Sequence, residues 1–163
     1  MNKKYIFEAF LQKNTRAMAV VETAIQESQY AANEHKGSME SQYDSTKEEA
    51  QMMVMAQSKR KAVLLENQIL LQKILDNHTL LNVAHNKIQI ASIFTLMNDN
   101  DNASTYIISP ILGGESLEVE GQVVTALSPT SPLGIRVMHK ECDDDITWNI
   151  QGVDKQYYIS SVC

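Results

Sequence analysis

The side chains with the clearest capacity for chemistry are carboxylates gathered around Gly37. They are Glu34, Glu40, Asp44, Glu48 and Glu49, and His35, Lys36 and Lys47 stand among them. Carboxylate oxygens at an exposed turn can hold a divalent cation or orient a water molecule if a partner supplies the remaining ligands. An ordinary charged turn fits the same residues. The sequence therefore predicts candidate acids here, with Glu40 and Asp44 as the foremost, and not a complete metal site.

Elsewhere the sequence contains no self-contained catalytic or metal-binding motif. It has no phosphate-binding glycine loop, no nucleophile elbow and no zinc-protease histidine pair. Two cysteines exclude a four-cysteine zinc finger, and the four scattered histidines are interpreted as structural or exposed. Residues 143–145 are all Asp, but no further acid follows at calcium-loop spacing, so we expect a solvated turn. We expect no enzymatic reaction, no metal site and no cofactor of the chain's own.

The candidate acids need a scaffold, and the sequence before residue 77 predicts a long helical hairpin. Residues 3–76 contain no proline and one glycine, Gly37, as a long helical region requires. A heptad-type stripe is formed by Phe7, Phe10, Asn14, Ala17, Val21, Ala24, Ser28 and Ala31. A second helical run is expected from Ser38 or Ser41 to Asp76. Because only a short turn near Gly37 joins the two runs, they are expected to pair antiparallel.

Methionines are concentrated in the second helical run. Four of the eight are Met39, Met52, Met53 and Met55. Methionine fills irregular gaps between helices, so we interpret this group as core packing of the hairpin; the alternative is a methionine-lined surface.

After residue 87 the pattern changes to short β-type runs. Most β-branched and aromatic residues lie in this part, and turn-like stretches at 98–102, 113–114 and 143–145 separate them. All three prolines and five of the six glycines also lie here. The pattern predicts a twisted antiparallel sheet of about four to six strands. Within it, Leu133, Val137 and Met138 have helical spacing, which predicts a short helix with Ser131 as its cap and Pro132 at its first position.

The sequence thus predicts an α+β protein of two parts. Residues 1–78 form an antiparallel coiled-coil hairpin with its tip at about 34–41, and residues 79–163 form the β-rich domain. Charge divides along the same line: ten basic residues balance ten acidic ones up to residue 80, whereas four basic residues face ten acidic ones afterwards. An acidic C-terminal part repels nucleic acid and suits a basic protein surface, although solubility alone explains it equally well.

Composition also indicates the cellular compartment of the protein. No run of about 18 apolar residues exists, so we expect no membrane helix and no membrane contact. The basic start of the chain lacks the apolar core of a signal peptide, and two cysteines form no disulfide framework. We therefore expect a cytoplasmic protein, and a monomer.

Several segments resemble the bacterial Gre transcript-cleavage factors, GreA and GreB, along almost the whole chain. Ser128-Pro129-Thr130-Ser131-Pro132-Leu133-Gly134, followed by Val137-Met138-His139-Lys140 and an acidic turn, is similar to the family's Ser-Pro-Leu/Ile-Gly…Leu-Leu-Gly-Lys…Gly-Asp segment. Thr105–Ile108 resembles a family strand of the form Tyr-x-Ile/Val, and Tyr157–Val162 resembles its closing strand. Gln42-Tyr43 with Lys47-Glu48-Glu49 resembles the stretch after the family's hairpin tip.

This resemblance implies a fold, a partner and a site. The C-terminal domain would be FKBP-like, and the partner would be RNA polymerase, with the hairpin reaching through the secondary channel towards nascent RNA. The docking residues would be Thr130, Ser131, Pro132, Leu133 and Gly134. In the family, two tip acids help to hold a magnesium ion shared with the polymerase, which then cleaves backtracked RNA.

At the tip the sequence departs from the family. Counting back from Tyr43 without gaps, the two family acids fall on Lys36 and Met39, and neither can bind magnesium as a carboxylate does. Glu34, Glu40 or Asp44 could substitute only if the tip were remodelled. We therefore expect polymerase binding with weak or absent cleavage. The alternatives are an active cleavage factor that uses remodelled acids, an FKBP-like peptidyl-prolyl isomerase or chaperone, and a coiled-coil adaptor.

Overall fold

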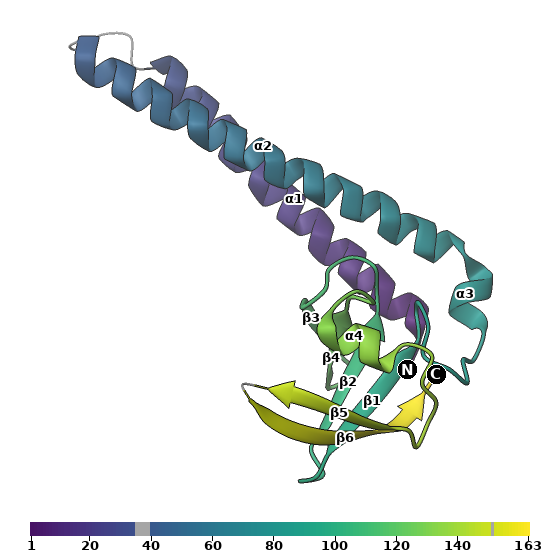
Figure 1. Ribbon diagram of the computed structural model, residues 1–163. Helices are drawn as coiled ribbons and strands as arrows, with labels where there is room; N and C mark the ends of the chain where they lie inside the picture. The colour runs from purple at the N-terminus through teal and green to yellow at the C-terminus, as the bar shows by residue number, and fades with distance from the viewer. Residues whose placement is uncertain (35–39, 151) are drawn as a thin grey trace. The chain divides into compact units, whose positions relative to one another are not determined.

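The computed structural model describes residues 1–34, 40–150 and 152–163, and their side chains apart from those of residues 32–34, 40–46, 149, 150 and 153. The elements follow in the order α1 (Lys3–Glu34), α2 (Glu40–Asp76), α3 (His78–Asn82), β1 (Ile93–Asn98), β2 (Ala103–Ile108), β3 (Ser116–Val119), β4 (Gln122–Leu127), α4 (Pro132–Val137), β5 (Asp145–Ile150) and β6 (Val153–Val162) (Figure 1). They divide into two compact units. Residues 11–70 form the helical unit, and residues 1–10 with 71–163 form the β unit.

Two long antiparallel helices make up the helical unit, as predicted (Figure 1). Of the predicted stripe on α1, Phe7, Phe10, Asn14 and Val21 are buried, Ala17, Ala24 and Ser28 are half-buried, and Ala31 is exposed. The heptad prediction is therefore confirmed as far as Ser28. Polar contacts between the helices include Asn14 Nδ2, which donates to Leu64 O at 2.8 Å, and Lys61 Nζ, which lies 2.8 Å from Glu22 Oε1.

The interpretation of the methionines as core packing is wrong for three of the four. Met52, Met53 and Met55 are 70%, 57% and 64% exposed, and the fourth, Met39, lies outside the described residues. The physical reason is that α2 is straight and carries apolar residues around much of its circumference, while α1 covers only one side of it. These side chains are exposed on α2 within the helical unit.

The β unit contains a single six-stranded sheet with the order β3-β4-β2-β1-β6-β5. The predicted antiparallel pairing holds for four of the five strand pairs. It is wrong for the fifth, because β2 and β4 are parallel, with Thr105 opposite Val124 and Ile108 opposite Leu127. Between them the chain forms β3, which runs antiparallel to β4 at the sheet edge, so β4 returns beside β2 in the same direction. The sheet is mixed.

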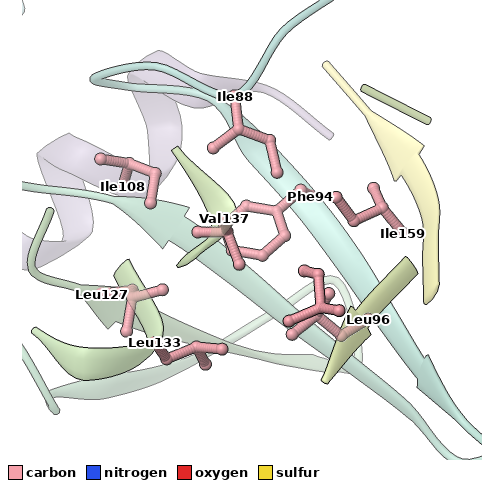
Figure 2. Packing of buried hydrophobic residues seen from close by; sticks show 9 residues of the cluster. Ile88, Phe94, Leu96, Ile108, Leu127, Leu133, Val137 and Ile159 are labelled. Atoms are coloured by element: carbon pink, nitrogen blue, oxygen red, sulfur yellow. The ribbon is translucent and has the colours of Figure 1, made fainter. Parts of the chain in front are cut away.

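Short helix α4 closes the hydrophobic core of the β unit. Leu133 and Val137 from α4 lie among side chains of the sheet and of the segment before β1 (Figure 2). The cluster comprises Ile88, Phe94, Leu96, Ile108, Leu127, Leu133, Val137, Ile146 and Ile159, each at most 9% exposed. Phe94 is fully buried and stacks on Tyr106 with ring centroids 5.5 Å apart. This core holds α4, and therefore the segment before it, in one orientation.

The α+β class, the helical pair, the sheet and the short helix are thus as predicted. The predicted division between residues 78 and 79 stays a prediction. No helix in the described ranges is long and apolar enough to cross a membrane.

Candidate functional site

The predicted docking segment forms the capped start of α4. Ser131 is the N-cap, its Oγ accepts a hydrogen bond from Gly134 N at 3.0 Å, and Pro132 occupies the first turn. The Ser131 hydroxyl also donates to Ser128 O at 2.7 Å, and Ile135 N donates to Ser131 O at 2.9 Å. Serine satisfies an otherwise unpaired helical N–H, and proline at this position loses no helical hydrogen bond. The predicted cap is confirmed, and it fixes the backbone from residue 128 to residue 135.

Two of the five predicted docking residues, Leu133 and Gly134, are buried. Leu133 is 3% exposed and belongs to the core of the β unit (Figure 2). Gly134 is packed so closely that an added Cβ would lie 2.0 Å from Ser128 O and 2.9 Å from Ser131 Oγ. Such contacts are shorter than any real Cβ makes, so only glycine fits there. Leu133 and Gly134 therefore shape the turn and do not present side chains to a partner.

The surface of the turn is formed by other residues. Thr130 and Pro132 are exposed, and Ser131 is half-buried. Thr130 Oγ1 lies 2.9 Å from Ser128 Oγ, which also accepts from Thr130 N at 3.3 Å. This pair of contacts holds Thr130 against the chain before the turn. The predicted docking residues are thus brought together, as consecutive residues of one rigid turn.

Ile135 is a surface residue that the sequence prediction did not include. It is 67% exposed, directly follows Gly134, and is one of the most exposed large apolar side chains of the β unit. The sequence could have indicated that Ile135 is exposed. Leu133 and Val137 define the inward face of α4, and Ile135 lies two residues from each, on the opposite face. Beside it, Arg136 Nη1 donates to Thr147 O of β5 at 3.3 Å, which ties the outer face of α4 to the sheet edge.

The acidic turn after α4 is a structural turn, as expected. Glu141 N donates to Asp144 Oδ2 at 2.8 Å, and Lys87 Nζ lies 2.9 Å from Glu141 Oε1. The hydrogen bond from Lys87 to the Glu141 carboxylate, and the negative charge of Glu141, raise the pKa of Lys87. Among the described residues, no group of three His, Cys, Asp or Glu side chains could hold a metal ion.

Most of the residues predicted at the hairpin tip lie outside the described part of the chain. Lys36 and Met39 lie outside the described residues, and so do the side chains of Glu40 and Asp44. Glu48 and Glu49, the two candidate acids whose side chains are described, are exposed. The prediction of altered tip chemistry therefore stays a prediction.

Comparison with known proteins completes this description. No family model matches the chain, and no curated protein does. Among solved structures, the chain matches GreA factor homolog 1 (Gfh1) of Thermus thermophilus at 12% identity and a TM-score of 0.36, over 98% of this chain and 94% of that one. A second structure, of the transcription factor Gfh1, matches at 12% identity and a TM-score of 0.40 over 99% and 94% of the two chains. Gfh1 of Thermus aquaticus matches at 13% identity and 0.38, over 99% and 96%. Each match covers nearly the full length of both chains.

Proposed function

We propose that this protein is a Gre-like transcription factor that binds RNA polymerase at its secondary channel. It would act in the cytoplasm as a monomer, without an enzymatic reaction and without a cofactor of its own. Its effect would be to regulate elongation or initiation by occupying the channel, where its tip would come close to nascent RNA.

The observation that carries this proposal is the turn before α4. The Ser-Pro-Leu-Gly sequence resembles the Gre docking segment, and the structure builds it as a rigid, capped turn with Thr130, Pro132 and Ile135 outward. A preorganised surface loses little conformational entropy on binding, which favours recognition by a protein partner. An aromatic or aliphatic side chain that enters a pocket of the partner is a common anchor of an interface, and Ile135 has the required exposure.

The helical unit supports the same proposal. The described helices have 32 and 37 residues, which corresponds to about 48 and 55 Å at 1.5 Å per residue. Met52, Met53 and Met55 of α2 are exposed apolar side chains. Methionine-rich surfaces adapt to partners because the side chain is flexible and polarisable. A narrow channel of a large protein would bury such a surface, whereas water alone disfavours it.

For cleavage, the proposal is that stimulation is weak or absent. Its support is the sequence, in which Lys36 and Met39 stand where the family has two acids. Loss of a carboxylate pair removes the means to hold a second magnesium ion while leaving the docking turn intact.

Binding is tested by a pull-down with the cognate polymerase. The Ile135→Ser and Thr130→Ala variants should bind at least about tenfold more weakly, as expected for a central apolar anchor and its neighbour. Val123→Ser is the matched control, because Val123 of β4 is similarly exposed, at 61%, but lies outside the turn. Absence of binding by the unchanged protein, or equal losses in the Ile135 and Val123 variants, would contradict the proposal.

Cleavage is tested separately on stalled, backtracked transcription complexes. The unchanged protein should give little or no cleavage above the polymerase alone, at concentrations that saturate binding. Robust cleavage that Glu40→Gln or Asp44→Asn abolishes would identify the chain as an active cleavage factor with remodelled tip acids. In that case the binding proposal stands and the cleavage proposal is wrong.

A further inference from the structure

A small cavity lies between α3 and the segment that leads into β1, all within the β unit. Its volume is about 220 Å³, and it is lined by Asn77, Thr79, Leu80, Val83, His85 and Gln89. At about 30 Å³ for each water-sized unit, it can hold a ligand of about seven non-hydrogen atoms. None of the lining residues is acidic. Most of them are exposed, whereas His85 is only 5% exposed and so forms the floor.

His85 is held from behind by two buried side chains. Its Nδ1 lies 2.6 Å from Ser92 Oγ and 3.4 Å from Lys3 Nζ. Lys3 is 6% exposed, and its Nζ also donates to Val83 O at 2.8 Å. Ser92 is fully buried, and its Oγ accepts from Gln89 N at 3.0 Å. A buried ammonium group therefore stands directly behind the imidazole ring.

These contacts assign the proton on the ring. A protonated Lys3 can only donate, so the Nδ1 atom that faces it must accept. The Ser92 hydroxyl accepts from Gln89 N and has two acceptors within reach for its one proton, His85 Nδ1 at 2.6 Å and Lys87 O at 3.5 Å; the shorter contact takes the proton, so it is directed to Nδ1. The neutral ring therefore carries its hydrogen on Nε2. No protein partner for Nε2 is found among the described residues, so this donor is available to the cavity that His85 lines.

We propose that this cavity binds a small carboxylate with a short branched aliphatic tail. The carboxylate would accept from His85 Nε2–H and from the exposed amide of Gln89, and the tail would contact Leu80 and Val83. The ammonium of Lys3 favours a negative ligand over a neutral one, because the buried charge is screened little by solvent and the negative charge of Cys163 offsets it only in part. A cation is disfavoured for the same reason. The site is independent of the turn before α4 and of polymerase binding.

The test is a titration of the full chain with sodium isovalerate, followed by the ring signal of His85 in NMR spectra at constant ionic strength. We expect a saturable shift with a dissociation constant of roughly 1 to 10 mM, as the size of the ligand allows. The bound carboxylate should also raise the pKa of His85, because a negative charge stabilises the protonated ring. Isovaleramide, which has the same shape and no charge, should bind at least about tenfold more weakly.

Two variants and a control locate the site. Gln89→Glu places a carboxylate at the cavity without disturbing a buried side chain, and it should weaken binding at least about tenfold. His85→Gln should do the same, monitored by the backbone amide signals of Thr79 and Leu80. His78→Gln is the matched control, since His78 is exposed on the same short helix and does not line the cavity.

Three results would overturn the proposal. They are the absence of a saturable shift up to about 100 mM isovalerate, equal binding of isovaleramide, and unchanged affinity in the Gln89→Glu variant. The last variant keeps the proposal testable if His85→Gln does not fold.

Discussion

The helical unit and the β unit differ in what they bury. In the described part of residues 11–70, only Asn14 and Val21 are buried, and one of these two is polar. The β unit instead encloses a continuous apolar cluster around Phe94, closed by Leu133 of α4. Burial of apolar surface is the main favourable contribution to folding, at about 25 cal/mol per Å². The β unit therefore has the means to fold by itself, while the helical unit has little core of its own.

The helical unit leaves several apolar side chains of α2 exposed, and the charged residues Lys59 and Glu66 lie among them. Met52, Met55, Val63 and Ile69 of α2 are each at least 50% exposed. Their spacing places them on one side of the helix, away from the side that α1 covers. The comparison teaches that the described apolar core lies in the β unit, whereas the helical unit leaves large apolar side chains of α2 exposed.

The largest effect should come from truncating the centre of the β core. Phe94→Ala removes a fully buried ring and should destabilise the protein by about 3 to 5 kcal/mol. Met53→Ala in the helical unit should change stability by less than about 0.5 kcal/mol, because Met53 is 57% exposed. Urea unfolding measures both. A comparable loss in the two variants would break the contrast between the units.

A smaller loss is expected where the turn before α4 meets Ser128. Gly134→Ala forces a Cβ to within 2.0 Å of Ser128 O and should cost about 3 kcal/mol. Gly113→Ala meets the Cβ of the same Ser128 at 3.1 Å and should stay within about 1 kcal/mol of the unchanged protein. Thermal unfolding compares the pair. Equal effects would show that the turn is more compliant than its contacts indicate.

In the helical unit, a substitution at Asn14 should increase the stability of the protein. Asn14 is 3% exposed, and its Oδ1 has no hydrogen-bond partner. Asn14→Leu removes this unpaired buried atom and adds apolar contact, so it should stabilise the unit by about 1 kcal/mol. The lost hydrogen bond to Leu64 O costs little, because an interior helical carbonyl keeps its backbone partner. A lower melting temperature by circular dichroism would show that Asn14 holds the pair in register at a net gain.

The smallest expected effect is a dependence of stability on pH, which arises in the β unit. Burial, and then the charge of Lys3, lowers the pKa of His85 below its ordinary value of 6.5. Burial also lowers the pKa of Lys3, and the charge of Cys163, which follows β6, opposes that shift. Below pH 6.5 the unfolded chain takes up a proton at this histidine before the folded chain does. Stability should therefore fall as the pH decreases from 6.5 towards the folded pKa.

Urea unfolding at pH 7.5 and 5.5 measures this decrease. His85→Gln should remove it, and His78→Gln should leave it in place. An identical pH dependence in both variants would assign the effect to other groups.

Much of the fold followed from patterns within short stretches of the chain. The stripe from Phe7 to Ser28, the β-type runs and the cap at Ser131 were predicted because each depends on residues a few positions apart. The candidate turn was predicted as well, since its residues are consecutive. The sequence did not predict which residues of the turn are buried, Leu133 and Gly134, and which are exposed, Thr130 and Pro132. That distinction depends on where Ser128 and the sheet lie relative to the turn.

The sequence by itself determined the α+β class, the long helical pair and the location of the capped turn, because periodicity, proline placement and capping act locally. Only the tertiary structure decided the parallel pairing of β2 with β4, the exposure of Met52, Met53 and Met55, and the placement of Lys3 behind His85. Each of these depends on segments far apart in the chain, 82 residues in the last case. Local preference does not specify which distant segments meet. Their pairing is decided by the apolar surface that the whole chain can bury.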